Sequence, residues 1–165
     1  MKKLLIALLV FTMGVQVQAQ DTAAPEMDEA QMARMMELMA QKIEMDVDTT
    51  LFTAVSTNTY VSENPKAVVM AMMVPETFAK AKEKMAADDT AQFKITDRGE
   101  KTINGVNVLF MEGTSEAEGS TLDNAVYCME IDANTCLMFI GMVDQKADAK
   151  YTEAMNKAMN SVIKK

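Results

Sequence analysis

Four methionines near the start of the chain have the clearest potential for chemistry. Met32-x-x-Met35 and Met36-x-x-Met39 would place four thioether sulfurs on one side of a short helix. Thioether sulfur is a soft ligand that suits copper(I), so these residues are candidate metal ligands. Methionine alone is a weak ligand, and we favour an amphipathic helix whose apolar face is built from methionine. That face consists of Met32, Met36, Met39 and Ile43. Its spacing also suits a helix that binds a groove in another protein.

The two cysteines could form a disulfide if the protein is exported. They flank a predicted hairpin turn, so the length of the turn decides which way each side chain points. A four-residue loop puts Cys128 opposite Phe139 and sends Cys136 to the other face of the sheet. A loop one residue shorter would put both cysteines on one face, diagonal to each other. We predict the first arrangement, with two buried thiols that are not bridged.

Acidic side chains gather in one stretch of the second half of the chain, namely Glu112, Glu116, Glu118 and Asp123. Their oxygens could hold a hard cation such as calcium. The spacing does not fit an EF-hand loop, which needs acids at alternate positions, a central glycine and a closing glutamate. We therefore predict a solvated acidic loop from Gly113 to Ser120 without a bound metal.

Several catalytic classes are excluded by residue type. The chain has no histidine, which removes Ser-His and Cys-His nucleophilic pairs and the usual ligands of zinc and haem. The sequence also lacks a glycine-rich phosphate loop and the G-x-S-x-G frame of a nucleophile elbow. An enzyme would have to rely on Asp, Glu, Lys, Tyr or Cys, and no such residues form a persuasive pair. We expect a non-enzymatic protein without a cofactor.

The first nineteen residues are typical of a cleaved secretion signal. Lys2 and Lys3 precede an apolar run from Leu4 to Val15, and Val17-Gln18-Ala19 has the small residues of a cleavage site. The run is too short to span a membrane, and no cysteine follows it to carry a lipid anchor. The sequence thus predicts a periplasmic or secreted protein that has no stable membrane insertion after cleavage.

The remaining chain, residues 20–165, suits one domain with an ordinary core. Loss of Lys2 and Lys3 would take the net charge from -8 to -10. An acidic surface of this kind disfavours nucleic acid and anionic lipid as partners. Methionine is the surplus residue, with 18 in the full chain against 6 phenylalanines, and it makes apolar surfaces soft and adaptable.

Hydrophobic periodicity predicts the elements that position these residues. We expect a helical extension within residues 20–48, with the helix itself from Glu26 to Glu44 or Met45, followed by a domain at 49–165. The expected strands are 50–62, 67–74, 92–97, 106–112, 122–132 and 136–143, with a short strand-like arm at 101–103 before the fourth of them. Turns are expected at Arg98-Gly99 and Ala133-Asn134, and Asn104-Gly105 indicates a hairpin or a bulge.

Two further helices complete the domain. Pro75 would open one that closes at Asp88-Asp89, and the last would run from about Ala147 to Ile163. The apolar stripe of the last helix comprises Tyr151, Ala154, Met155, Ala158, Met159 and Val162. Together these elements predict an α+β fold of order β-β-α-β-β-β-β-α, a mostly antiparallel sheet with helices packed on it, preceded by the Met-rich helix.

The order of elements also resembles a known group. The Thr102-Ile103-Asn104-Gly105 step into a strand, the strand Leu137–Val143 and the closing helix after a short acidic connector are similar to the PsbP-like superfamily over residues 50–165. The resemblance implies a sandwich of sheet and helices that binds partners and seldom catalyses. It transfers no site residue, and the Met-rich helix departs from the pattern.

These observations predict an exported binding or interaction module. Its partner would be an unidentified protein or a small apolar ligand, held by the adaptable methionine-rich surface. The alternative is a soft-metal protein that binds copper(I), or one that scavenges oxidants, through its methionines.

Overall fold

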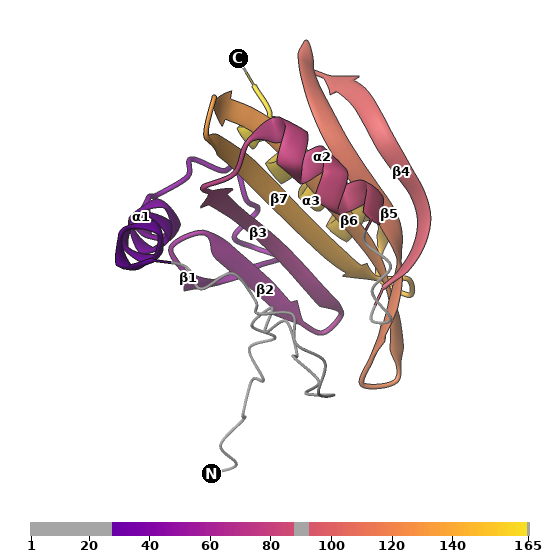
Figure 1. Cartoon of the computed structure of the whole chain (residues 1–165). Coiled ribbons are helices and arrows are strands. Elements are labelled where there is room, and N and C mark those ends of the chain that lie inside the picture. The colour runs from indigo at the N-terminus through magenta and orange to yellow at the C-terminus, as the bar shows by residue number, and fades with distance from the viewer. Residues whose placement is uncertain (1–27, 88–92, 165) are drawn as a thin grey trace, which may run out of the picture.

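The structure, a computed structural model, describes residues 28–87 and 93–164, where one antiparallel sheet of seven strands is accompanied by three helices (Figure 1). The predicted signal peptide and Asp88-Asp89 lie outside the described residues. Along the chain the elements are α1 Glu29–Ala40, β1 Thr53–Ser56, β2 Thr59–Glu63, β3 Lys66–Val74, α2 Phe78–Ala87, β4 Lys94–Ile103, β5 Val106–Ala117, β6 Ser120–Asp132, β7 Thr135–Asp144 and α3 Ala149–Val162. The strands lie in the order β1-β2-β3-β7-β6-β5-β4, which confirms the α+β class and the antiparallel sheet.

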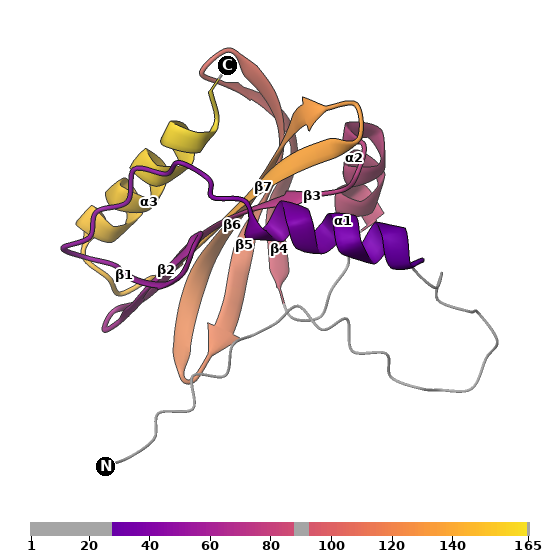
Figure 2. The ribbon, with the colours of Figure 1, turned by 90° about the vertical axis from the view of Figure 1, so that its left-hand side faces the viewer.

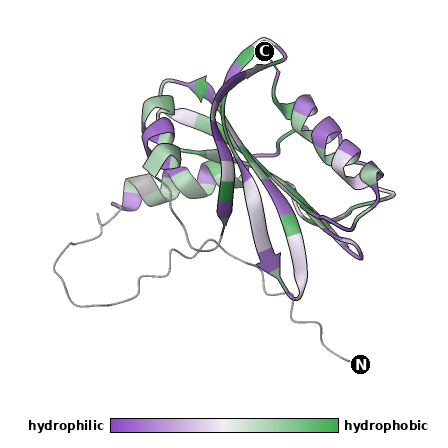
Figure 3. Ribbon diagram, turned by 90° about the vertical axis from the view of Figure 1, so that its right-hand side faces the viewer, coloured by the Kyte–Doolittle hydropathy of each residue, from purple (hydrophilic) through white to green (hydrophobic). Residues whose placement is uncertain are grey.

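One face of the sheet is covered by α3 and forms the main hydrophobic core (Figure 2). Strand alternation directs Val69, Val108 and Phe139 toward this face, and each is fully buried. The predicted stripe of the last helix packs on them and is buried along its whole length. Figure 3 shows the matching alternation of hydrophobic and hydrophilic residues around α3. A β-carbon on Gly141 would lie 2.7 Å from Cγ of Met155, so the bare glycine lets α3 sit close to β7.

The opposite face carries α2, which lies across the sheet from α3 (Figure 2). Thr77 Oγ1 accepts a hydrogen bond from the Lys80 N–H at 3.2 Å, which satisfies a donor in the first turn of this helix. Helix α2 buries Ala81 and half-buries Phe78 and Met85 against a small apolar cluster on β5, β6 and β7. The contact made by α2 is therefore much smaller than that made by α3.

Residues 41–48, which we call the connecting arm, join α1 to the main core in an extended conformation. Ile43 is buried, and Met45 and Val47 pack beside it at alternate positions. The side chain of Asn58 holds the arm at its start: Oδ1 accepts the Ile43 N–H at 2.9 Å, and Nδ2 donates to the Gln41 carbonyl at 2.7 Å. These hydrogen bonds stabilise extended backbone, so α1 ends at Ala40.

The predicted end of the first helix near Glu44 or Met45 is thus wrong, and so is the placement of Ile43 on its apolar face. Periodicity alone suggested four more residues of helix, since Ile43 continues the spacing of Met36 and Met39. In the folded chain Ile43 belongs to the core beneath α3 instead.

The first strands are arranged as a compact meander. The β-like segment 50–62 folds back on itself around Thr57-Asn58 to give β1 and β2, and β3 follows the turn at Asn64-Pro65. Strand β3 alternates between buried and half-buried residues, so both of its faces are apolar, as the continuous hydrophobic run predicted.

Two segments expected to be irregular are strands. Arg98-Gly99 lies inside β4, where Gly99 pairs with Phe110 in an unbroken stretch of register. The expected acidic loop from Gly113 to Ser120 does not form either, because β5 continues to Ala117 and turns only at Glu118 and Gly119, with φ of 49° and 78°. Polar side chains pair across the two strands here, as when Thr121 Oγ1 donates to Glu116 Oε1 at 2.7 Å.

The Asn104-Gly105 hairpin is confirmed, with positive φ at both residues (51° and 77°). It joins β4 to β5 at the outer side of the sheet. Strand β4 carries a bulge between Ile95 and Asp97, and Gly113 of β5 faces that bulge. A β-carbon on Gly113 would lie 2.9 Å from Cα of Ile95, so a larger residue would push the two strands apart.

Candidate functional site

Helix α1 lies beside β3, away from the main core (Figures 1 and 2). Its inner side is fixed by two contacts. Leu38 is buried, and Arg34 Nη2 donates a hydrogen bond to Thr135 Oγ1 at 3.4 Å. These contacts determine which side of the helix faces the protein.

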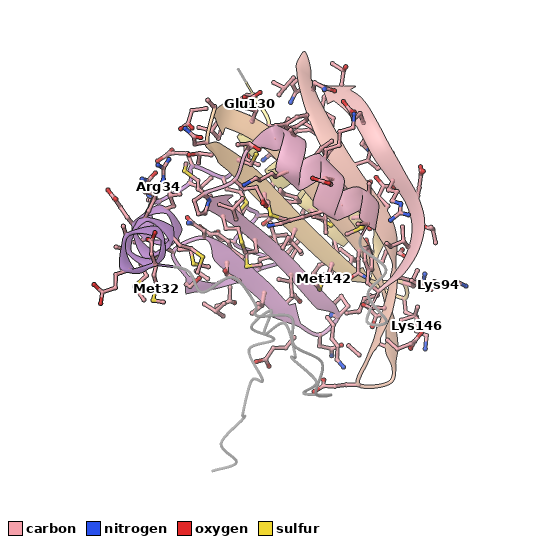
Figure 4. All side chains as sticks on the ribbon, in the orientation of Figure 1. Met32, Arg34, Lys94, Glu130, Met142 and Lys146 are labelled. Atoms are coloured by element: carbon pink, nitrogen blue, oxygen red, sulfur yellow. The ribbon has the colours of Figure 1, made fainter. Side chains whose placement is uncertain are left out.

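Three of the four predicted methionines point away from the protein. Met32, Met36 and Met39 are 46%, 64% and 50% exposed, and we call this surface the methionine face. Met35 is half-buried and does not belong to it. Figure 4 shows Met32 and Arg34 leaving α1 in different directions. The apolar face of α1 therefore points to solvent, whereas an ordinary amphipathic helix would bury it.

A second methionine-rich surface was not predicted. Met70 and Met72 of β3 point to the α2 side of the sheet, together with Met138 and Met142 of β7, and all four are half-buried. Figure 4 shows Met142 on this face of the sheet. The sequence signal for this surface is a pair of methionines two residues apart in β3 and another pair four residues apart in β7, which is a strand period and not a helical one.

The two cysteines lie beneath α2 and not on opposite faces. In the observed register Cys128 pairs with Met138, and Cys136 pairs with Glu130, so the cysteines share one face as diagonal neighbours. The pairing of Asp132 with Thr135 keeps the predicted register, but an irregularity between Glu130 and Asp132 shifts the register by one residue before Cys128 is reached. The prediction of opposite faces is wrong for this reason, and the prediction of two buried, unbridged thiols is confirmed.

The thiols are hydrogen bonded to each other in an apolar setting. Burial is the largest cause that raises the pKa of Cys128, and the neighbouring Cys136 raises it further. Burial also raises the pKa of Cys136, and the acidic Glu130 acts in the same direction. Neither sulfur is poised as a thiolate nucleophile.

The four predicted acidic residues do not converge on one point. Glu112 pairs with Lys101 at 2.8 Å and Glu118 pairs with Lys66 at 2.7 Å. Glu116 accepts a hydrogen bond from a threonine, and Asp123 accepts one from Gln145 Nε2 at 2.7 Å. Within residues 28–87 and 93–164, no group of three His, Cys, Asp or Glu side chains is arranged to hold a metal ion.

A polar cluster of three side chains occupies the outer part of the α3 face of the sheet. Lys101 Nζ lies 2.8 Å from Glu112 Oε1, and Tyr127 OH donates to the same oxygen at 2.7 Å. The ammonium also sits 4.2 Å from the centre of the Phe110 ring and 4.8 Å from that of Tyr127. Each polar group of this cluster thus has a partner within it.

The pKa shifts in this cluster all follow from that mutual pairing. The hydrogen bond from Lys101 lowers the pKa of Glu112, although burial opposes it. Burial alone would lower the pKa of Lys101, but hydrogen bonds to Glu112 and Tyr127 raise it overall. Burial raises the pKa of Tyr127, and its hydrogen bond to Glu112 raises it further. All three pKa values are shifted further from neutral pH. Such shifts are typical of a structural network, whereas a general acid or base needs a pKa near the working pH.

Every helix within the described part of the chain is too short or too polar to cross a lipid bilayer.

Comparison with known proteins gives a likeness in shape. No known protein family and no curated protein matches the sequence. Among solved structures, LpqN of Mycobacterium tuberculosis, described as involved in cell envelope biogenesis, has a TM-score of 0.49 at 13% identity, over 70% of this chain and 79% of LpqN. PA94 of Pseudomonas aeruginosa, a protein of unknown function, has a TM-score of 0.47 at 14% identity, over 74% of this chain and 84% of PA94. Membership of the PsbP-like superfamily stays a prediction.

Proposed function

We propose that this protein is a periplasmic or secreted, non-enzymatic binding module whose partner contacts the methionine face of α1. The observation that carries the proposal is the exposure of Met32, Met36 and Met39 on one side of a helix that buries a different side. A soluble domain gains by burying such a stripe, so an exposed one marks a surface that is covered in a complex.

The chemistry of this face favours an apolar groove in another protein, or a small apolar ligand. Methionine side chains are flexible and polarizable, so they adapt to grooves of different shape. Residues at spacings of four and three form the anchor pattern of a helix bound in a groove. Glu29 and Glu37 are exposed on the same helix, which favours a groove with a basic rim.

The proposal that the module is non-enzymatic is supported by the electrostatics. General acid–base catalysis works best with a pKa near the working pH. Here every shifted pKa in the two candidate clusters lies further from neutral pH than its ordinary value. The groups concerned are Lys101, Glu112, Tyr127, Cys128 and Cys136. The chain also has no histidine to take this role.

Site-specific photo-crosslinking tests the binding surface. A photoreactive amino acid at Met36 is expected to give one adduct of defined mass in the envelope or secreted fraction of the producing cells. Adding Met32→Gln and Met39→Gln removes apolar contact area while keeping helix propensity, so the adduct should be lost.

The matched control places the photoreactive residue at Glu153, an exposed position on α3. It is expected to give no adduct of that mass. An identical adduct from Glu153, or none from Met36, would rule out the methionine face as the binding surface.

Oxidant scavenging is the second candidate function, and the same exposure favours it, because accessible methionines are oxidised to sulfoxides first. It predicts sulfoxide at Met36 in protein recovered from peroxide-treated cells and no crosslinked partner. Copper(I) binding by α1 has less support: Met35 is half-buried, and Met32 and Met39 lie about 10 Å apart along the helix axis.

A further inference from the structure

Four sulfur-containing residues of this protein come together beneath α2, away from the methionine face. Cys128 and Cys136 are fully buried there and hydrogen bonded to each other. Met138 lies directly opposite Cys128 on the neighbouring strand. Met85 of α2 packs against the same cluster from above. Two thiols and two thioethers therefore share one small apolar space.

The spacing of the two cysteines suits a shared ion better than a direct bond. Diagonal neighbours on antiparallel strands have Cα atoms about 7–8 Å apart, whereas disulfides usually need about 4.4–6.8 Å. Two thiolates that bind one metal ion need sulfurs only about 4.6 Å apart, twice a typical metal–thiolate bond. Cys128 and Cys136 are such a diagonal pair, and their sulfurs already touch through a hydrogen bond.

The available donors select the class of ion. Structural zinc requires four ligands, usually cysteine and histidine, and this chain has two cysteines and no histidine. Hard cations require oxygen ligands, whereas the walls here are Ala81, Leu109 and the half-buried Phe78. Thiolate and thioether sulfur together favour copper(I).

We propose that Cys128 and Cys136, assisted by Met138, form a buried binding site for copper(I) beneath α2. Binding breaks two S–H bonds and forms two Cu–S bonds, and both protons leave to solvent. No electron is transferred, so neither an oxidant nor a reductant is required. This site is independent of the methionine face and of the function proposed for it.

Helix α2 controls access to the site. Its only fully buried residue is Ala81, with Phe78 and Met85 half-buried beside it, so lifting the helix exposes little apolar area. Glu76 lies just before the helix and near enough to both thiols to act on their charge. Its carboxylate forms an ion pair with Lys84 and thereby ties the start of α2 to its last turn.

An anaerobic titration of the reduced mature chain with copper(I), in competition with a chromophoric chelator, tests the proposal. We expect one saturable equivalent in the wild type and loss of that equivalent in the Cys128→Ser, Cys136→Ser double variant. Met138→Leu should weaken binding without changing the stoichiometry. The matched control, Met32→Leu with Met36→Leu and Met39→Leu, should bind as the wild type does.

X-ray absorption on the copper-loaded wild type adds a measurement that needs no variant, in case the serine variant does not fold. Sulfur-only coordination is expected. Nitrogen or oxygen ligands, retained binding in a folded double variant, or loss of binding only in the α1 control would each overturn the site.

Discussion

Glu112 shows how a single side chain acts through its partners. It accepts hydrogen bonds from both Lys101 and Tyr127, on a part of the sheet that α3 does not fully cover. The ammonium of Lys101 in turn lies against two aromatic rings. Removing the carboxylate charge would therefore weaken both of its hydrogen bonds at once, although partial exposure keeps the effect of each small.

We predict that Glu112→Gln destabilises the protein at pH 7 and that the effect shrinks in acid. The pKa of Glu112 is lowered in the folded state, so the ionised carboxylate contributes fully above its ordinary value of 4.5 and loses its contribution as the pH falls through the folded-state pKa. The expected difference in unfolding free energy at pH 7 is up to about 1 kcal/mol. Urea unfolding of both proteins at pH 7 and below pH 4.5 measures it.

A double-mutant cycle with Lys101→Met is the control for this prediction. If Glu112 acts through Lys101, the cost of Glu112→Gln should largely vanish in the Lys101→Met background. An undiminished cost there, or a difference that grows in acid, would contradict the assignment.

For single residues, the sequence predicts burial better than it predicts which residues become neighbours in the fold. It predicted that Cys128 and Cys136 are buried and unbridged, but it argued this from opposite faces of the sheet, which is not the observed arrangement. It did not predict their shared face, since the irregularity between Glu130 and Asp132 shifts the register by one residue and no sequence signal marks it. It also treated Glu116 as a loop residue, because acidic residues are rare in strands and the cross-strand hydrogen bond that Glu116 accepts is not visible in sequence.

Among the elements, the connecting arm depends on one polar side chain. Asn58 is 6% exposed and satisfies the backbone at both Gln41 and Ile43. The arm has no strand partner of its own, so these two hydrogen bonds replace a ladder. Further along, Ser161 Oγ accepts the Asp46 N–H at 2.8 Å and attaches the arm to α3.

We predict that Asn58→Ala destabilises the protein by about 1–3 kcal/mol, because it leaves the buried N–H of Ile43 without an acceptor. The substitution should loosen the connecting arm locally as well as lower the stability of the whole protein. Hydrogen–deuterium exchange at Ile43 is expected to accelerate far more than exchange in β6 and β7.

Ser161→Ala is the matched control, since it removes one hydrogen bond at an exposed part of the arm. It should cost less than Asn58→Ala and leave exchange at Ile43 unchanged. Equal effects of the two substitutions would show that Asn58 has no special role in holding the arm.

The helices illustrate what periodicity can and cannot predict. The predicted apolar stripe of α3 is buried at every one of its residues. A helix with a strong apolar face that follows a sheet packs that face on the sheet. In α1 the spacing of Met32, Met36 and Met39 predicted one shared face of the helix, but not whether that face points to the protein or to solvent. Leu38 and Arg34 determine the direction through contacts with distant strands, which no local pattern contains.

On the scale of the whole molecule, the sheet separates two apolar layers of unequal size. The main core under α3 includes residues from the connecting arm, whereas the cluster under α2 is small. The sequence predicts a domain that begins at residue 49, but Ile43, Met45 and Val47 contribute to the main core. We therefore expect the folding unit to begin near residue 41.

Two truncations test this boundary. Deleting residues 20–40 removes α1 and the burial of Leu38, at a cost of about 2 kcal/mol. Deleting residues 20–48 also removes the arm and should cost about 4 kcal/mol more, which is comparable to the whole stability of many domains. Circular dichroism and urea unfolding of both chains measure the difference. Equal stability of the two would mean that the domain begins at residue 49.

The open sheet has one more consequence, which concerns association between copies. A sheet that does not close leaves unpaired backbone at its outermost strands, and such edges can template fibrils. Here β1 has only four residues and an irregular register, and β4 is bent by the bulge between Ile95 and Asp97. Charged side chains also recur along β4, at Lys94, Asp97, Arg98, Glu100 and Lys101. Both borders are thereby made poor templates, which protects a methionine-rich chain from aggregating at high local concentration.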